Sequence, residues 1–490
     1  MRVVGNIASD SEVVATADGA ITAGKPVLVN ADGTVAQVAE NAESQSVGTA
    51  TSVGSDTTAD NACVYDSNSD RVVIVYEDTG NSNYGTAIVG TVSGTSISFG
   101  TPVVFESANA DFYNISFDSN ANKVLIVYRD NGNAGYGTSI VGNVDSSDNS
   151  ISFGTAVVYN SGAVAFCGID FDTSNNKHLL VYRDSGDSSK CQSIVATVSG
   201  TSVSYGSETL VYDDNTNFQF CVFDSNANKF VAGFNDSSSL GRCKVGTISG
   251  TSVSYGSLAT YHSGSGTVSG EGLFDSKHNQ IIIPFSDSAA SSYGRVVIGS
   301  ISGTSISFGS EVTFQGTTQV YDLTAFYDNV AHKFVIIYPG TSGAASGKYI
   351  VGTTASNQSA SFGTEAQFHA SNISAQYQSF RVAFDSTERR GVFVIADTGD
   401  SDNGKAIGIR VAHTTQNLTS ENFIGFAKDA VADGAVATLH TANSISRNQS
   451  SLTAGQTYFV QNDGTLSETA DDPSVTAGTA ISATELIVKG

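Results

Sequence analysis

One sequence motif recurs seven times along the 490-residue chain and constrains its fold more than any other feature. Its clearest copy is FDSNANKVLIVYRD, and copies begin near Tyr65, Phe117, Phe171, Phe223, Phe274, Phe326 and Phe384, at spacings of 52, 54, 52, 51, 52 and 58 residues. A second motif follows each of the first six copies, with the consensus SISFG and its aromatic residue at Phe99, Phe153, Tyr205, Tyr255, Phe308 and Phe362. Two motifs in a constant phase indicate one supersecondary unit repeated along the chain.

Each repeat is interpreted as four short antiparallel strands. The Asn-rich DSNANK segment predicts a tight turn, because Asn and Asp tolerate the left-handed backbone that such turns require. The following run VLIVY is apolar at every position, which is typical of a strand buried on both faces. A Gly/Asn/Ser-rich loop then leads to a third strand, and SGTSISFG predicts a turn and a fourth strand in which Ile97 and Phe99 share one face.

Four strands in about 52 residues, apolar on both faces, predict a blade of a β-propeller. The fold class is therefore all-β, a seven-bladed β-propeller with small β modules formed by the two termini. An open stack of the same sheets would expose apolar faces at both ends, and no polar capping repeat is present in the sequence. Two packed β-sandwiches remain an alternative, although they do not account for the constant period.

The two ends of the chain lie outside the repeats and resemble each other. TAGKPVLVNADGTVAQVAE begins at Thr22 and TAGQTYFVQNDGTLSETA at Thr453, and each predicts a hairpin with an Asp-Gly turn. GTATS at Gly48 and GTAIS at Gly478 form a second match. We expect residues 1–57 and 420–490 to form β modules that pack near each other, with the propeller at 58–419 between them. The seventh blade lacks an SFG strand, which residues 44–53 or 420–427 are expected to supply.

Composition excludes several classes of function. The net charge of −24 argues against binding to nucleic acid or to anionic membranes. The five cysteines include no CxxC pair, so neither a zinc site nor a redox motif is expected. No signal peptide and no transmembrane segment are predicted from the sequence.

The terminal segments resemble a module of phage structural proteins. ENFIGFAKDAVADGAVATLH, TAGQTYFVQNDGTLSETA and AGTAISATELIVKG are similar to tail-fibre, head-fibre and decoration proteins of phages that infect marine bacteria and cyanobacteria. The likeness covers about 130 residues at the two ends. It implies a non-enzymatic virion component without catalytic residues, anchored to other virion proteins by its ends and oligomeric on the particle. Its location would be the virion, and the propeller would be displayed toward host-surface glycans or proteins.

Two groups of residues are candidates for ligand binding. Asp66, Asp70 and Asp118 lie in turns with alternating oxygen ligands, as in calcium loops, although neither the central Gly nor the final Glu of such a loop follows. Hairpin turns closed by Asx hydrogen bonds explain these residues more simply, so no cofactor is expected and calcium is the one alternative. Tyr84, Tyr136 and Tyr293 lie in Asn- and Asp-rich loops and are candidate glycan-binding residues, or else pack within their blades.

Two other functions stay open beside the virion hypothesis. A glycan-degrading enzyme on a propeller would need paired carboxylates, and a sialidase would also need an arginine cluster. The sialidase Asp-box needs the Trp that this chain lacks. A bacterial surface adhesin would need a secretion signal, which the sequence does not show. We therefore predict that the protein is not an enzyme.

Overall fold

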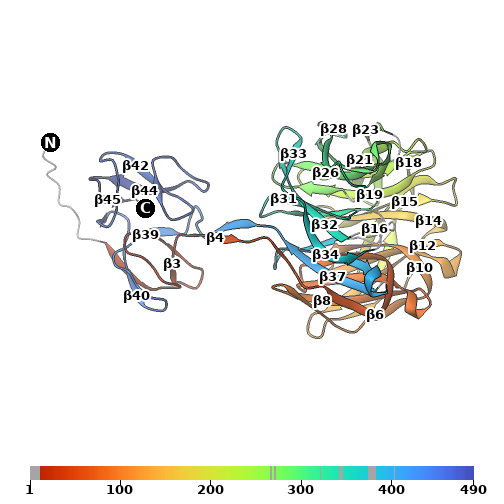
Figure 1. Cartoon of the computed structure of the whole chain (residues 1–490), viewed down its shortest axis with the longest axis horizontal. Coiled ribbons are helices and arrows are strands. Elements are labelled where there is room, and N and C mark those ends of the chain that lie inside the picture. Colours follow the sequence, from red (N-terminus) through yellow and green to blue (C-terminus); the bar gives the residue numbers. More distant parts are fainter. Residues whose placement is uncertain are drawn as a thin grey trace. The chain divides into compact units, whose positions relative to one another are not determined.

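The computed structural model describes residues 11–264, 267–269, 272–320, 322–340, 346–373, 382–401 and 403–489. It contains two compact units (Figure 1): the propeller unit, Gln45–Val411, and the terminal unit, which combines Met1–Ser44 with Ala412–Gly490. Helical structure in the described ranges is limited to short 3-10 turns: η1 (Thr79–Asn81), η2 (Asn131–Asn133), η3 (Ser288–Ala290) and η4 (Thr398–Asp400). No helix in these ranges has the length and hydropathy needed to cross a membrane.

Seven four-stranded antiparallel sheets form the propeller unit; six are built from one repeat each, and the seventh takes its fourth strand from the N-terminal segment. Blade 1 contains β6 (Thr51–Asp66), β7 (Arg71–Asp78), β8 (Tyr84–Ser93) and β9 (Ser96–Phe99). Blade 2 contains β10 (Val103–Asp118), β11 (Lys123–Asp130), β12 (Tyr136–Asp145) and β13 (Ser150–Phe153). Blade 3 contains β14 (Val157–Asp172), β15 (Lys177–Asp184), β16 (Lys190–Ser199) and β17 (Ser202–Tyr205). Blades 4 and 5 contain β19 (Asn217–Asp224), β20 (Lys229–Asn235), β21 (Gly241–Ser249), β22 (Ser252–Tyr255); and β25 (Leu273–Asp275), β26 (Gln280–Asp287), β27 (Tyr293–Ser302), β28 (Ser305–Phe308). Blades 6 and 7 contain β30 (Thr324–Asp328), β31 (Lys333–Pro339), β32 (Ser346–Ala355), β33 (Ser359–Phe362); and β35 (Val382–Asp385), β36 (Arg390–Asp397), β37 (Asn403–Arg410), β5 (Ser46–Val47).

Short additional strands extend several blades. Four of them pair with the third strand of their blade beside its fourth strand: β18 (Thr209–Tyr212), β23 (Ala259–His262), β29 (Val312–Gln315) and β34 (Ala366–Asn372). β24 (Thr267–Ser269) pairs with β26 in blade 5. In blades 1 and 2 this role belongs to the first residues of β10 and β14, which then continue as the innermost strand of the next blade.

The central strand of each blade is apolar throughout because both of its faces are covered by neighbouring blades. In β7, Val72, Ile74 and Tyr76 pack in the core shared with blade 7, whereas Val73 and Val75 pack in the core shared with blade 2. Five further cores join the other neighbouring blades in the same way, so that seven hydrophobic cores connect seven blades. The core between blade 7 and blade 1 closes the ring, and the predicted seven-bladed β-propeller is confirmed.

The chain closes the ring by giving the last blade a strand from its first segment. β5 pairs with β37 through Val47 and Ile409, and the first residues of β6 also pair with β37 before β6 enters blade 1. Of the two segments expected to fill this place, residues 44–53 do so. The division between the units therefore follows residues 44 and 411 rather than 57 and 419, because residues 45–57 already belong to the ring.

The DSNANK segments form hairpin turns with a shared geometry. The Asp side chain of each motif is buried, and in blade 2 Asp118 Oδ1 accepts hydrogen bonds from the backbone N–H groups of Asn120 and Ala121. The residue before each central strand has a left-handed φ of 52–56°, which explains the frequent Asn. This register also corrects the sixth repeat: Tyr327 precedes the turn Asp328, so the motif begins there and not at Phe326.

The glycine of the SFG motif lies where the backbones of adjacent blades come close together. A Cβ atom at Gly154 would lie 1.9 Å from the carbonyl oxygen of Thr201, which belongs to the outer hairpin turn of the next blade. The same close approach to the outer turn of the next blade occurs at Gly100, Gly206, Gly256 and Gly309. A Cβ atom at Gly48 would lie 2.7 Å from the carbonyl oxygen of Thr95. Gly363 is different, since its nearest neighbour is Val351 oxygen at 3.8 Å. It faces blade 7, whose fourth strand comes from the N-terminal segment, so that no hairpin turn joins the third and fourth strands there.

The terminal unit contains two five-stranded sheets with the same strand order. The first module consists of β1 (Glu12–Thr16), β40 (Val436–His440), β39 (Phe423–Ala427), β2 (Pro26–Val29) and β3 (Val35–Gln37). The second consists of β41 (Ile445–Ser446), β45 (Leu486–Val488), β44 (Val475–Ala480), β42 (Thr457–Val460) and β43 (Leu466–Ser467). The two modules share a core that includes Leu28 and Phe426 from the first and Tyr458 from the second. A ribbon of β4 (Glu40–Glu43) and β38 (His413–Gln416) completes this unit.

The two modules are copies of one arrangement, down to a matching β-bulge. The bulge follows the pair Val27–Gly425 in the first module and Tyr458–Gly478 in the second, and these glycines have φ values of 152° and 155°. Gly425 is thus the counterpart of Gly478. The match of Gly48 with Gly478 was wrong, because Gly48 follows the fourth strand of blade 7.

The propeller is inserted within the first module rather than between two modules. In the second module, the seven residues 468–474 connect β43 to β44. The corresponding connection in the first module, from β3 to β39, is residues 38–422 and contains the ribbon and the whole propeller. The second module therefore shows that a short loop at this place is sufficient to complete the fold of such a module.

This insertion predicts that the terminal unit folds without the propeller. Glu43 pairs with His413 at the end of the ribbon, so residues 11–44 joined to 412–489 through a two-residue Asn-Gly turn form a continuous hairpin. We expect a monomer with a cooperative thermal transition and a β-type circular dichroism spectrum. A spectrum of an unfolded chain would contradict the division into two units.

Candidate functional site

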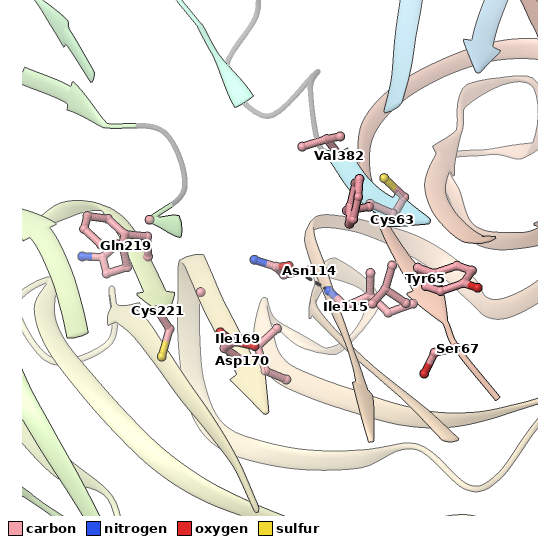
Figure 2. Close-up of a pocket in the computed structure, with 16 residues that line it drawn as sticks. Cys63, Tyr65, Ser67, Asn114, Ile115, Ile169, Asp170, Gln219, Cys221 and Val382 are labelled. Atoms are coloured by element: carbon pink, nitrogen blue, oxygen red, sulfur yellow. Dashed lines mark hydrogen bonds between the residues drawn. The ribbon is translucent and has the colours of Figure 1, made fainter. Parts of the chain in front are cut away.

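The innermost strands of the blades surround a central cavity of about 370 Å³ (Figure 2). Its wall is formed mainly by short stretches of the inner strands of blades 1, 2, 3, 4 and 7, and polar side chains are interspersed with apolar ones. The lining residues of blades 2, 3 and 4 include Asn114, Gly168, Asp170, Gln219 and Phe220. Because these positions come from different blades, a ligand in the cavity would contact several repeats at once.

Three phenylalanines precede this wall on the inner strands of blades 2, 3 and 4. Phe112, Phe166 and Phe218 each lie two residues before a cavity-lining residue, at a β-bulge where the strand register shifts. Their φ values are 52°, 47° and 53°, in the left-handed region that bulky residues rarely adopt. The rings contact one another in sequence, with centroids 5.0 Å apart for the first pair and 5.1 Å for the second. All three are half-buried, and we call them the phenylalanine ladder.

Two arginines of the central strands flank the phenylalanine ladder. The guanidinium of Arg129 lies 4.3 Å from the ring centroid of Phe112 and forms an ion pair with Asp111. Arg183 occupies the equivalent position in blade 3, where it pairs in register with Ala165. Its Nη1 and Nη2 atoms donate to Asn217 Oδ1 and Ser189 Oγ, both at 2.8 Å. These arginines bring positive charge to an otherwise acidic protein.

The polar groups of the cavity wall differ in how many hydrogen bonds they make. Both amide atoms of Asn114 have a partner, since its Nδ2 donates to the Cys167 carbonyl oxygen and its Oδ1 accepts from the backbone N–H of Ile115. Asp170 accepts from the backbone N–H groups of Phe171 and Phe223. Gln219, which is only 8% exposed, donates to Thr216 Oγ1, but its Oε1 has no hydrogen-bond partner among the described residues. A buried acceptor without a donor favours a site that a ligand or water completes.

A carboxylate cluster lies at the interface of blades 1 and 2 beside the phenylalanine ladder. Burial is the largest cause that raises the pKa of Glu77 to about 7, and the charges of Asp60 and Asp111 raise it further. Asp60 also accepts a hydrogen bond from the backbone N–H of Phe112 at 3.2 Å. Near neutral pH, Glu77 is therefore partly protonated.

This cluster predicts a pH-dependent stability that Glu77→Gln removes. The folded-state pKa lies above that of the unfolded chain, so the ionised form opposes folding, and stability declines as the pH rises from the unfolded value to about 7. After allowance for partial exposure, we expect Glu77→Gln to stabilise the protein by about 1–2 kcal/mol at pH 8 and by almost nothing at pH 4.5. Urea unfolding at the two pH values measures this. Glu421→Gln, at an exposed site of the terminal unit, controls for net charge, and an equal gain in both variants would contradict the assignment.

The structure places the three candidate tyrosines at one repeat position in separate blades. Tyr84, Tyr136 and Tyr293 begin the third strands of blades 1, 2 and 5, and all are half-buried. Each pairs in register with the last Asp of its own central strand. Because each tyrosine stays within its blade, the three do not converge on one site. Their role in glycan binding stays a prediction.

The candidate calcium ligands do not converge either. Asp66 accepts from the backbone N–H groups of Asn68 and Ser69, while Asp70 accepts from the Tyr65 hydroxyl. Asp118, in the next blade, lies 3.6 Å from His178 Nε2. Burial pushes the pKa of Asp118 upward, but the His178 and backbone hydrogen bonds outweigh it, so the pKa lies below its usual value. Within the described ranges, no three or more His, Cys, Asp or Glu side chains are grouped so that they could hold a metal ion.

Sequence reasoning missed the phenylalanine ladder and Gln219. The recognised repeat begins at Phe117, after the ladder position, and the residues before it differ between blades: Asp111-Phe112-Tyr113 in one and Ala165-Phe166-Cys167 in the next. One signal was available, since a Phe stands five residues before each of the copies at Phe117, Phe171 and Phe223. That spacing indicates a repeat position, although it does not reveal the left-handed backbone.

Comparisons with known proteins support the fold and no particular activity. No family model and no curated protein matches the chain. Among solved structures, the BP39L lectin from Burkholderia pseudomallei aligns with a TM-score of 0.52 and 10% identity, over 74% of this chain and 98% of the lectin. The fold is that of a β-propeller. A chain of the mitotic checkpoint complex (TM-score 0.45, 9% identity, 75% and 95% coverage) and a protein from Lactobacillus plantarum (TM-score 0.48, 10% identity, 72% and 97% coverage) are also similar. At these identities the likeness of the propeller concerns its fold alone.

Proposed function

We propose that this chain is a non-enzymatic structural protein of a phage particle, in which the terminal unit attaches to the virion and the propeller binds the host surface. The observation that carries the proposal is the insertion of the propeller into one loop of a duplicated β module. The second module closes the same place with residues 468–474, so the module does not need the propeller for its fold. A large domain in such a loop is suited to recognition, because a loop insertion leaves the core of its host module intact.

The resemblance of the terminal segments to phage fibre and decoration proteins supports the same division of roles. Those segments form the terminal unit, and the propeller supplies the phenylalanine ladder, the flanking arginines and the cavity. A lectin with the same propeller fold is consistent with a binding role for this part. The partners on this proposal are other virion proteins for the terminal unit and a host-surface molecule for the propeller.

Particle composition tests the proposal directly. We expect mass spectrometry of purified particles, from the phage whose genome encodes this sequence, to detect the chain at a constant copy number. The terminal unit alone, residues 11–44 joined to 412–489, should assemble into particles that lack the native chain, whereas the propeller unit alone should not. Absence of the chain from pure particles would overturn the virion assignment.

A glycan-degrading enzyme is the second candidate, and the carboxylate cluster favours it. Glu77, with a pKa of about 7 beside Asp60 and Asp111, has the protonation behaviour expected of a general acid that lies near two other carboxyl groups. We propose binding without turnover because Asp111 forms an ion pair with Arg129 and is therefore not free to act as the second catalytic carboxylate. A glycan array combined with a hydrolysis screen separates the two functions: turnover that Glu77→Gln abolishes would establish the enzyme.

A further inference from the structure

The phenylalanine ladder is held in a conformation that the blade fold does not require. Blade 1 makes the corresponding bulge with one residue fewer, between Ala59 and Asn61, and still completes its inner strand. A left-handed backbone at a bulky residue is strained, and such strain is concentrated at ligand-binding and catalytic positions. Three equivalent instances in adjacent blades therefore indicate a function of the rings beyond the local pairing of strands.

The three rings form a continuous aromatic row, and each phenylalanine lies two residues before a residue that lines the cavity. Phe166 contacts both Phe112 and Phe218, so the row runs across blades 2 to 4. The rings remain partly accessible to solvent, and two amide-bearing residues flank one of them in the sequence: Asn217 precedes Phe218 and Gln219 follows it. Aromatic rings stack on the apolar faces of sugars while amides bond to hydroxyl groups. This mixture fits an oligosaccharide better than a purely apolar ligand.

Arg183 adds a charge preference to this aromatic row. It reaches from blade 3 to Asn217 in blade 4, so its guanidinium lies between the backbone positions of Phe166 and Phe218. Its hydrogen-bond partners among the described residues are Asn217 and Ser189, both neutral, and its Nε is buried without a partner. Burial lowers the pKa of Arg183. A half-buried cation that lacks a carboxylate partner, in a chain of net charge −24, gains most from an external anion.

We propose that Phe112, Phe166, Phe218 and Arg183 form a binding site for an acidic oligosaccharide at the cavity, with Gln219 as an additional hydrogen-bond acceptor for its hydroxyl groups. The inference rests on the proposed function and specifies the ligand of the propeller. Sugar rings stack on the phenylalanine ladder, and a sugar carboxylate binds the guanidinium of Arg183. Arg129 cannot take this role in the same way, since Asp111 already neutralises it.

Isothermal titration of the full chain with two hexasaccharides tests the site: a hexauronate, which carries carboxylates, and the neutral maltohexaose. We expect the hexauronate to bind at least ~10-fold more tightly than maltohexaose, as a charge-assisted hydrogen bond to a guanidinium implies. Arg183→Gln should weaken hexauronate binding by ~10-fold and leave maltohexaose unchanged. Phe166→Leu keeps the strained backbone and the apolar bulk but removes the aromatic ring. It should therefore weaken the binding of both hexasaccharides.

Arg447→Gln is the matched control, because it removes one positive charge at an exposed site of the terminal unit. The Arg447→Gln variant should bind both hexasaccharides as tightly as the native chain does. Thermal unfolding midpoints that match the native chain should show that all variants are folded. Failure of the native chain to bind hexauronate, equal affinity for both hexasaccharides, or equal effects of Arg183→Gln and Arg447→Gln would each overturn the proposal. The chain's presence in phage particles does not depend on this site, so either proposal can fail while the other stands.

Discussion

Gly154→Ala is expected to destabilise the propeller by about 3 kcal/mol, although it adds a single methyl group. The new Cβ atom would lie 1.9 Å from the carbonyl oxygen of Thr201, far inside van der Waals contact. That oxygen belongs to backbone in the outer turn of the next blade, so it cannot move away as a flexible side chain would. Relief would require the two blades to separate along their outer edge, which would also disturb the core between them. Urea unfolding followed by circular dichroism measures the change.

Gly363→Ala is the matched control for this experiment. Gly363 occupies the same repeat position, and its N–H donates to Val351 oxygen just as the N–H of Gly154 donates to Val141 oxygen. Its nearest neighbour would lie 3.8 Å from a new Cβ atom, because blade 7 has no outer hairpin turn. We expect a change within about 0.5 kcal/mol for Gly363→Ala. Equal effects of the two substitutions would contradict the packing account of the SFG glycine.

The elements that the sequence predicted best are those whose pattern has one physical explanation. A run such as VLIVY, apolar at every position, requires a strand covered on both faces, and a constant period of such strands leads to a ring. The turn residues were equally informative, since the left-handed position before each central strand favours Asn. The closing strand was narrowed to two segments. Sequence alone did not choose between them, because Ser46-Val47-Gly48 shares only its Ser and Gly with the SFG motif.

Other features depend on contacts that no local pattern encodes. The two modules share clear TAG hairpins, whereas their second hairpins match mainly at Gly425 and Gly478, so the insertion point was not visible. The candidate tyrosines were placed at the start of strands, but whether they converge depends on the order of blades around the ring. Whether an arginine at this position has a carboxylate partner likewise depends on its tertiary neighbours, since Arg129 has Asp111 beside it and the equivalent Arg183 has no such carboxylate among the described residues.

Deletion of one complete repeat, residues 171–222, is expected to abolish the folded monomer. In the ring, every blade covers an apolar face on each neighbour, and Val47 and Ile409 complete the last blade. Removing one repeat makes the sheet that contains Ile126 and the sheet that contains Phe230 direct neighbours. The six remaining blades then span only six sevenths of the circle, so either a gap opens between two blades or the closing strand loses its partner. Either result exposes the fully buried residues of at least one core to water. We expect aggregation in size-exclusion chromatography with light scattering, and no cooperative transition from the propeller in calorimetry.

An open repeat array would respond differently to the same deletion. Each unit of such an array contacts only its immediate neighbours, so the loss of one unit shortens the array and lowers stability by roughly one interface. The terminal unit provides an internal control in the deleted chain, because its two modules draw no strand from residues 171–222 and its own thermal transition should remain. A soluble deletion variant with both transitions intact would therefore show that the blades do not depend on closure, and the assignment of ring closure to the pairing of β5 with β37 would be wrong.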